Sequence, residues 1–150
     1  GAALAAATFE IPAFAMSLES SESMDFGLAA EMVWPLIQRV MEISLPPRTV
    51  VNINIPAIAL EKYPETEPEV VLVPVETNPM AYGFDTGADP KGRPYYWSTN
   101  FPVPEPSEFL TDTQALAAGK VTISTISYDL NQPKSLDVLK SAMVGNNPSG

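Results

Sequence analysis

The side chains that most often carry catalysis in proteins are missing from this sequence. Its 150 residues contain neither His nor Cys. That composition excludes imidazole acid–base chemistry, thiolate nucleophiles and zinc sites built on these two residues. A magnesium or calcium site would have to use carboxylate, amide and backbone oxygens. The acidic residues are scattered, without an Asp-Asp pair, so we identify no catalytic residue and no metal ligand set in the chain.

Two groups of oxygen-bearing side chains come nearest to a cation site. Asn52 and Asn54 alternate along a β-branched stretch, but we favour a structural role for them, hydrogen-bonded to backbone or water beside a sheet. Asp85 and Asp89 lie in a Gly-containing segment that superficially resembles a calcium loop. That segment lacks the alternating oxygens and final Glu of an EF-hand, so we interpret it as a polar turn.

Three consecutive aromatic residues, Tyr95, Tyr96 and Trp97, are the strongest candidates for an interaction surface. Aromatic side chains on a protruding hairpin are enriched at interfaces because they bury a large area with little loss of conformational entropy. Packing of the three rings on the chain's own core is an equal alternative. Only Lys91 and Arg93 lie nearby as basic residues, which argues against stacking on nucleic acid.

Composition and charge place limits on the class of protein. Apolar residues make up 45% of the chain and charged residues 17%, which predicts one globular domain over residues 1–150. The net charge of −10 favours solubility, or a basic partner, and opposes binding to nucleic acid or anionic lipid. No run approaches the ~20 apolar residues of a membrane span. The opening residues lack a starting Met and a basic segment, so we expect a cut or partial chain without a signal peptide. The compartment stays open.

Hydrophobic patterning predicts the elements that position these residues. The order indicates an α/β fold in which helices flank a central sheet and an antiparallel β-hairpin protrudes. Asp25 or Ser23 is expected to cap the second helix, Pro35 to kink it, and Ser135 to cap the last helix. The first strand is mostly apolar, which predicts cover on both faces. We expect helices over 2–9, 26–43 and 136–144, a short helix or turn over 111–118, strands over 11–18, 49–56, 69–75 and 120–128, hairpin arms over 81–84 and 94–99, loops over 57–68 and 100–107, and an unordered tail from 145.

Four stretches of the sequence together carry a resemblance to a known family. They are Gly1-Ala-Ala3 with Ile11-Pro-Ala-Phe-Ala-Met-Ser-Leu18, Val51-Asn-Ile-Asn-Ile-Pro56, Gly92-Arg-Pro-Tyr-Tyr-Trp97, and Thr111-Asp-Thr113 followed by Gly119-Lys-Val-Thr-Ile-Ser-Thr-Ile126. In order and spacing these stretches resemble the SurE family of nucleoside-monophosphate phosphatases, and the resemblance extends along nearly the whole chain. Lys120, Thr125 and Ala5 depart from the family's usual Tyr, Pro and acidic residue.

The resemblance implies that the chain is the C-terminal portion of such a protein. The family's metal-binding loops, including an Asn-Asp-Asp-Gly loop, belong to its N-terminal half and are missing here. A divalent metal such as Mg²⁺ or Mn²⁺ is therefore expected only together with that half. Gly1 would lie close to the phosphate pocket, although a tight helix–sheet contact is the interpretation that we favour. The aromatic hairpin and the last helix look like the family's oligomer-forming elements.

Two hypotheses about function follow. In the first, the chain is a fragment of a SurE-like nucleotidase, inactive alone and dependent on an N-terminal metal-binding half. In the second, it is a non-catalytic structural subunit that docks in a larger assembly through its aromatic hairpin. A protein partner or a homo-oligomer is expected in either case. Because ancestry does not establish function, the sequence leaves open whether the chain takes part in catalysis.

Overall fold

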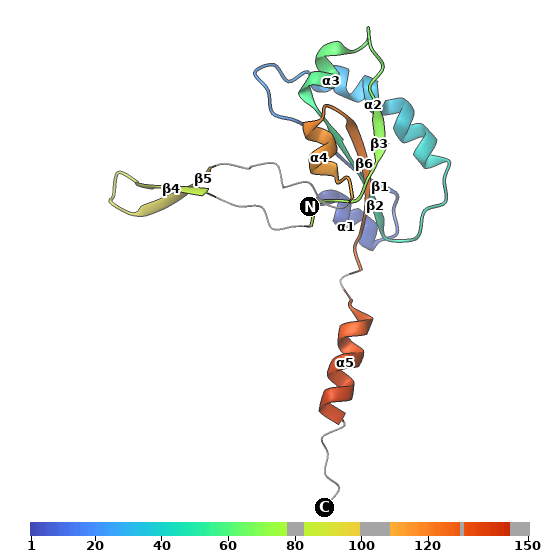
Figure 1. Cartoon of the computed structure of the whole chain (residues 1–150), viewed down its shortest axis with the longest axis vertical. Coiled ribbons are helices and arrows are strands. Elements are labelled where there is room, and N and C mark those ends of the chain that lie inside the picture. Colours follow the sequence, from blue (N-terminus) through green and yellow to red (C-terminus); the bar gives the residue numbers. More distant parts are fainter. Residues whose placement is uncertain (78–82, 100–108, 130, 145–150) are drawn as a thin grey trace, which may run out of the picture.

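The computed structural model describes residues 1–77, 83–99, 109–129 and 131–144. A four-stranded sheet carries helices on both faces, and a separate two-stranded antiparallel ribbon stands away from it (Figure 1). Along the chain the elements are α1 (Ala2–Thr8), β1 (Ala13–Leu18), α2 (Phe26–Met41), β2 (Thr49–Ile55), α3 (Ala57–Lys62), β3 (Val70–Leu72), β4 (Gly83–Ala88), β5 (Pro94–Thr99), α4 (Asp112–Ala117), β6 (Val121–Ser127) and α5 (Pro133–Val144).

The sheet is mixed, with the strand order β1-β2-β6-β3. β1 and β2 run parallel, β6 runs antiparallel to β2, and β3 runs parallel to β6. The predicted α/β class, with a helix-flanked central sheet and a protruding antiparallel hairpin, is thereby confirmed. None of the helices in the described part of the chain has the length and apolar character that crossing a membrane requires.

The core lies on the sheet face that α2 and α3 cover. Val51, Ile53 and Ile55 alternate along β2 and point into this layer, where they join Met32 and Val33 of α2. The opposite face carries a smaller apolar cluster of Ala7, Ala13 and Val50 under α1. Successive side chains of a strand point to opposite faces, so Asn52 and Asn54 lie on the same face as Val50. The predicted division of β2 into an apolar and an amide-bearing face is confirmed.

The prediction that β1 is covered on both faces is wrong. Ala13 is buried, but Met16 and Ser17 are exposed. The reason is that β1 is the edge strand of the sheet, next to β2 only, and α1 contacts its early residues. An apolar run can form a strand without receiving a complete second layer.

Helix α2 begins where the sequence predicts. The Asp25 side chain accepts a hydrogen bond from the Leu28 backbone N–H at 2.9 Å, so Asp25 rather than Ser23 is the cap. Pro35 lies inside the helix. Helix α5 starts at Pro133, earlier than predicted, so Ser135 is within the helix and does not cap it. Proline suits the first helical turn because the backbone N–H there has no intrahelical partner.

The predicted loop over 57–68 is wrong in its first part, where the structure has the short helix α3. Pro56 occupies the N-cap position with an extended backbone, and the following Ala-Ile-Ala-Leu-Glu-Lys residues favour a helix. The Glu19 carboxylate accepts a hydrogen bond from the Ala57 backbone N–H at 2.9 Å. Ala59 and Leu60 are buried against the core, so a packing requirement overrides the loop-like composition of this segment.

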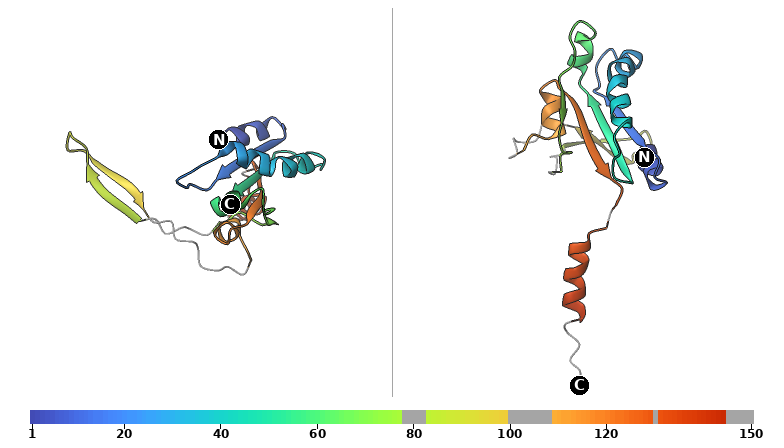
Figure 2. Two further views of the ribbon diagram at one scale, coloured as in Figure 1. Left: turned by 90° about the horizontal axis from the view of Figure 1, so that it is seen from above. Right: turned by 90° about the vertical axis from the view of Figure 1, so that its right-hand side faces the viewer.

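The ribbon of β4 and β5, with the turn that joins them, is named the arm and comprises residues 83–99. The views in Figures 1 and 2 show it standing clear of the sheet. Its strands pair from Gly83↔Thr99 to Ala88↔Pro94. β4 is thus longer than predicted, and the turn is confined to residues 89–93. Tyr82, residues 100–107 and the tail from 145, on which predictions were also made, lie outside the described residues.

Candidate functional site

A polar cluster joins the two chain segments that lead into and out of the arm. Asp112 is only 7% exposed. Its Oδ1 accepts the Glu76 backbone N–H at 2.8 Å, and its own backbone N–H donates to the Pro74 carbonyl at 2.9 Å. The Thr111 hydroxyl donates to Glu76 Oε2 at 3.0 Å. We name Pro74, Glu76, Thr111 and Asp112 the arm root, because these contacts hold the ends of the intervening chain side by side.

The arm root is also attached to the sheet. Asn54 Nδ2 on β2 donates to Thr122 Oγ1 on β6 at 3.2 Å and more weakly to Asp112 Oδ2 at 3.4 Å. Helix α4 begins at Asp112 with a capping box, in which the Thr111 backbone N–H donates to Gln114 Oε1 at 3.3 Å. The interpretation of Asn54 as a structural residue fits these contacts, although its partners are side chains rather than backbone or water.

The arm root does not fit a metal site. Asp112 Oδ1 already accepts the N–H groups of Glu76 and Thr113, both at 2.8 Å, and Asp112 Oδ2 lies 3.4 Å from Asn54 Nδ2. Within residues 1–77, 83–99, 109–129 and 131–144, no three His, Cys, Asp or Glu side chains are grouped so that they could hold a metal ion. These contacts hold the two chain segments in position relative to each other, and we derive no catalytic step from them.

Gly1, the predicted phosphate-proximal residue, occupies the N-cap position of α1. It is exposed, and its carbonyl accepts the Ala5 backbone N–H at 3.1 Å. No side chain caps this helix, and a Cβ atom added to Gly1 would meet no heavy atom of a non-adjacent residue within 4 Å. The favoured prediction of a tight helix–sheet contact at Gly1 thus has no support from this geometry, and a role near phosphate stays a prediction.

The arm presents the predicted aromatic residues to solvent. Tyr96 is 68% and Trp97 69% exposed, and Tyr95 is exposed to a lesser degree. The Tyr95 ring lies over Gly87 of the paired strand, where a Cβ atom would come within 2.5 Å of the ring. The three side chains therefore do not pack on the sheet core. Whether they form an interface stays a prediction.

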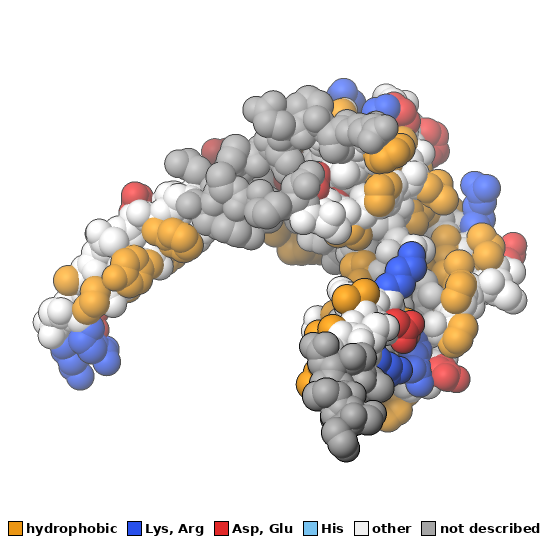
Figure 3. Space-filling model, turned by 60° about the horizontal axis from the view of Figure 1, so that its bottom comes forward, with side chains coloured by type: hydrophobic (Ala, Val, Ile, Leu, Met, Phe, Trp, Pro, Cys, Tyr) orange, Lys and Arg blue, Asp and Glu red, His pale blue; other side chains and the backbone are white. Residues whose placement is uncertain are grey.

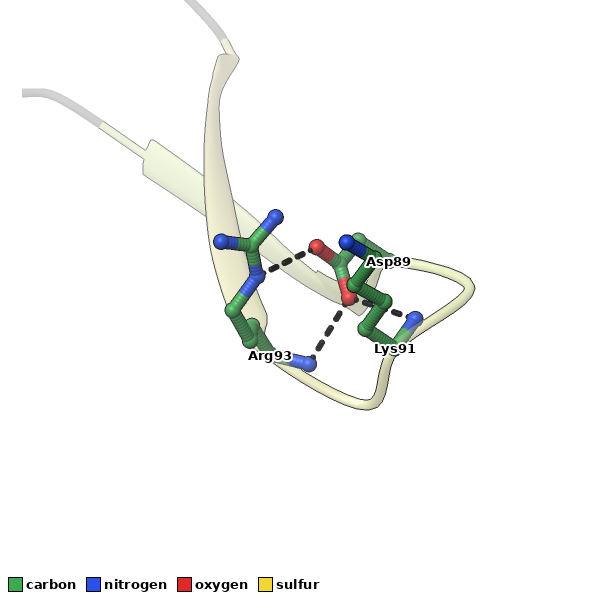
Figure 4. Close-up of polar contacts among 3 residues, drawn as sticks. All are labelled: Asp89, Lys91 and Arg93. Atoms are coloured by element: carbon green, nitrogen blue, oxygen red, sulfur yellow. Dashed lines mark hydrogen bonds and ion pairs between the residues drawn. The ribbon is translucent and has the colours of Figure 1, made fainter.

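The end of the arm is closed by Asp89 (Figure 4). Its Oδ1 accepts the backbone N–H groups of Lys91 at 2.8 Å and Arg93 at 2.9 Å, and its Oδ2 lies 2.7 Å from Arg93 Nε. The Arg93 backbone N–H and, next, the Arg93 guanidinium lower the pKa of the exposed Asp89 carboxyl. The predicted polar turn is correct for Asp89, whereas Asp85 lies within β4.

Two surface cavities lie away from these groups. One, of about 320 Å³, is lined largely by apolar residues of the α1–β1 and α2–β2 connections, among them Ile11, Ile43 and Leu45. The other, of about 510 Å³, lies between the α3–β3 connection and the end of α4, and Lys62 and Lys120 line it. Neither cavity includes Gly1, the arm root or the aromatic residues of the arm.

The fold has a counterpart among solved structures. The structure superposes on the crystal structure of the SurE protein from Aquifex aeolicus with a TM-score of 0.72, at 22% sequence identity, over 94% of this chain and 55% of the other. That similarity shows the fold alone. The fold of this chain is therefore shared with a SurE protein, and the comparisons of sequence show a similarity to the same family.

The family model described as survival protein SurE matches residues 1–74. A protein named 5'-nucleotidase SurE 1 from Thermus thermophilus is 34% identical over 96% of this chain and 55% of its own length. The 5'-nucleotidase SurE of Syntrophobacter fumaroxidans is 30% identical over 92% of this chain and 54% of its own. The chain is similar to members of the SurE family, and it spans about half the length of the curated relatives it matches.

One part of the sequence interpretation is corrected by these findings. The resemblance placed the chain as the C-terminal portion of the family, but the family model matches the N-terminal region, residues 1–74. Of the four stretches that carried the resemblance, the Gly92–Trp97 and Thr111–Ile126 stretches lie outside this match. The short motifs and the comparisons indicate the same family, but the motifs did not identify which portion of it the chain resembles.

The arm root is the feature that sequence reasoning missed. Thr111-Asp-Thr113 is interpreted from the sequence as the start of a helix and as part of the family resemblance, and Glu76 is not singled out at all. The available signal was a polar Thr-Asp pair ahead of a short apolar helix, which is a helix-cap pattern. That pattern could not reveal that the Asp112 side chain reaches a backbone N–H 36 residues away.

Proposed function

We propose that this chain supplies the sheet-and-arm scaffold of a nucleoside-monophosphate phosphatase. On this proposal the chain is inactive alone, and hydrolysis requires metal-binding residues from outside residues 1–150. The substrate class is a nucleoside 5'-monophosphate, and the metal a divalent ion such as Mg²⁺ or Mn²⁺. The chain's own residues would position the neighbouring parts of the site and would not act on the phosphate.

The observation that carries this proposal is the sequence similarity to relatives named 5'-nucleotidases. They match 92% and 96% of this chain, whereas the chain covers only 54% and 55% of them. The chemistry of the described residues also supports a scaffold role for this chain and metal-binding residues outside it. Phosphoryl hydrolysis of this kind needs a metal ion to activate water and to stabilise charge on the transferred group. The arm root does not offer a metal ion a free set of oxygen ligands.

A complementation assay tests the proposal. Phosphate release from nucleoside monophosphates would be measured with added Mn²⁺ or Mg²⁺ for this chain alone, and for this chain mixed with the part of the T. thermophilus relative that it does not cover. We expect no turnover by the chain alone and metal-dependent turnover by the mixture, abolished by a chelator. Turnover by the chain alone, or an inactive mixture in which the two parts form a complex, would contradict the proposal.

A second candidate function is a structural subunit that assembles through the arm, either with another protein or with copies of itself. The exposure of Tyr96 and Trp97 favours it, since a two-stranded ribbon without a partner layer is marginally stable in water. Figure 3 shows hydrophobic side chains along the arm, which is the character of an interaction surface. Gel filtration with light scattering would test this function, and a monomer at all accessible concentrations would refute self-assembly.

A further inference from the structure

We propose that the apolar surface cavity between the α1–β1 and α2–β2 connections binds a zwitterionic ligand, of the class of a free amino acid with an aromatic side chain. The aromatic group enters the cavity, Glu10 binds the ammonium group of the ligand, and Arg48 binds its carboxylate. The inference is independent of the proposed functions, because this cavity includes neither Gly1, the arm root nor the aromatic residues of the arm.

The size and the lining of the cavity suit an apolar group. Its volume is about 320 Å³, and a cavity of about 150 Å³ already accommodates a benzene ring. Phe14 of β1, Val40 of α2 and Val51 of β2 line it, together with Ile11 and Ile43 of the two connections. Ile11 is 55% and Ile43 59% exposed, and exposed apolar side chains gathered around a cavity are typical of a ligand-binding groove.

Two residues of opposite charge line the same cavity, Glu10 on one connection and Arg48 on the other. Neither forms an ion pair within the part of the chain that the structure describes, where the ion pairs join other residues. The two charges therefore do not neutralise each other by direct contact, and both are available to a ligand.

The Asp129 carboxylate lies within reach of the Arg48 charge but takes its hydrogen bonds from Asn131. Its Oδ1 accepts the Asn131 backbone N–H at 3.0 Å and the Asn131 side-chain amide at 2.6 Å. Hydrogen bonds from Asn131 are the main cause of the lowered pKa of Asp129, and the Arg48 charge is the smallest. Asp129 therefore leaves the Arg48 guanidinium free to bind another carboxylate.

The backbone at the two charged residues supports a binding role. Among the described residues, Glu10 and Arg48 are the non-glycine residues with a left-handed backbone, at φ 58° and 62°. Glu10 follows α1 in a Schellman arrangement, in which the Ile11 N–H donates to the Ala6 carbonyl at 3.2 Å. Glycine adopts this backbone without the steric penalty of a side chain. Such strained positions concentrate at ligand sites, and here both of them line one cavity.

The pair of opposite charges selects the class of ligand. An anionic amphiphile would meet the Glu10 carboxylate and the field of a chain with a net charge of −10, and a cationic one would meet the Arg48 guanidinium. An uncharged ligand would leave both charges without a partner. A zwitterion complements both of them, and complementary charges are a source of specificity in binding.

Titration of the 150-residue chain with three related compounds tests the inference. The compounds are L-phenylalanine, 3-phenylpropionate, which lacks the ammonium group, and 2-phenylethylamine, which lacks the carboxylate. Amide chemical shifts of Ile11, Ile43 and Arg48 report on the cavity. L-Phenylalanine should shift these amides, and each analogue should bind about threefold or more weakly, because it loses one charged contact at a partly exposed site.

Charge-removing variants assign each contact. Glu10→Gln should weaken the binding of L-phenylalanine but not of 3-phenylpropionate, and Arg48→Gln should weaken the binding of L-phenylalanine but not of 2-phenylethylamine. Glu31→Gln and Lys91→Gln are matched controls, which make the same changes in net charge outside the cavity and should alter binding by less than about twofold. Glu10→Gly and Arg48→Gly should also lose the ligand without a lower midpoint of thermal unfolding, because glycine suits the left-handed backbone.

The other outcomes overturn the inference. Equal binding of the three compounds would mean an apolar cavity that does not recognise charge. Shifts confined to the arm, or no shift at millimolar L-phenylalanine, would mean that the cavity does not bind this class of ligand. Shifts of the same three amides with protein concentration alone would mean that a second copy of the chain covers the cavity. A loss of binding in the matched controls equal to that in the cavity variants would assign the effect to net charge.

Discussion

The sheet and the arm use similar strands in opposite settings. In β2 the residues Val51, Ile53 and Ile55 alternate with amides and face a helical layer that buries them completely or nearly so. In β5 aromatic side chains occupy both faces, and the described residues provide no helix that covers either one. Strand-forming residues are therefore enough to pair two strands. Whether the paired strands stabilise this chain or an assembly depends on which surface covers them.

The largest expected effect tests that difference directly. Ile53 is fully buried, so Ile53→Ala should lower the free energy of unfolding by about 2–5 kcal/mol through lost burial and a residual cavity. Trp97→Ala in the dissociated chain should change it by less than about 0.5 kcal/mol, because the ring is exposed. Urea unfolding at low protein concentration measures both. A comparable loss in the two variants would mean that the arm packs on its own sheet.

The arm root should show an intermediate effect. Asp112→Ala leaves the backbone N–H groups of Glu76 and Thr113 without their acceptor, and an unsatisfied buried donor costs about 1–3 kcal/mol. Hydrogen exchange at the Glu76 amide should accelerate in the same variant, since its hydrogen bond is lost.

A matched control for the arm root is Asp137→Ala. It removes an exposed carboxylate of α5 whose only described ion pair is a 3.7 Å contact with Lys140, and it should be nearly neutral. Stability of Asp112→Ala equal to that of the control would show that the arm root does not hold the two chain segments together.

Loss of the N-cap of α2, a helix that covers the sheet, should have a smaller and more local effect on stability. Asp25→Ala removes the acceptor of the Leu28 N–H and should cost about 1 kcal/mol. Ser23→Ala is the matched control, because the sequence offered Ser23 as an alternative cap and the structure does not use it. Thermal unfolding distinguishes the two variants, and an equal loss in both would reassign the cap.

These residues also explain how far the sequence could predict the molecule. Features that depend on residues close in the sequence could be predicted from short patterns. They are the Asp25 cap, the alternation in β2 and the turn at Asp89. Helix α3 could not be predicted because its stability comes from burial of Leu60 in the core, which depends on residues far away in the sequence. The arm root could not be predicted for the same reason, since Glu76 and Asp112 are 36 residues apart in the sequence.

The smallest expected effect concerns the end of the arm and depends on pH. Hydrogen bonds from Arg93 and Lys91 lower the pKa of Asp89 below its ordinary value of 3.8, so the ionised carboxylate favours the closed turn. This contribution is present above the ordinary pKa and disappears as the pH falls through the lowered pKa of the folded turn. Amide chemical shifts of Lys91 and Arg93 should therefore change at the acid end of a titration, and Asp89→Asn should remove that change. Because the carboxyl is exposed and screened by solvent, global stability should respond little, in contrast to the substitutions in the sheet. A titration that persists unchanged in Asp89→Asn would assign the acid transition to another group, and ionised Asp89 would then not be what closes the turn.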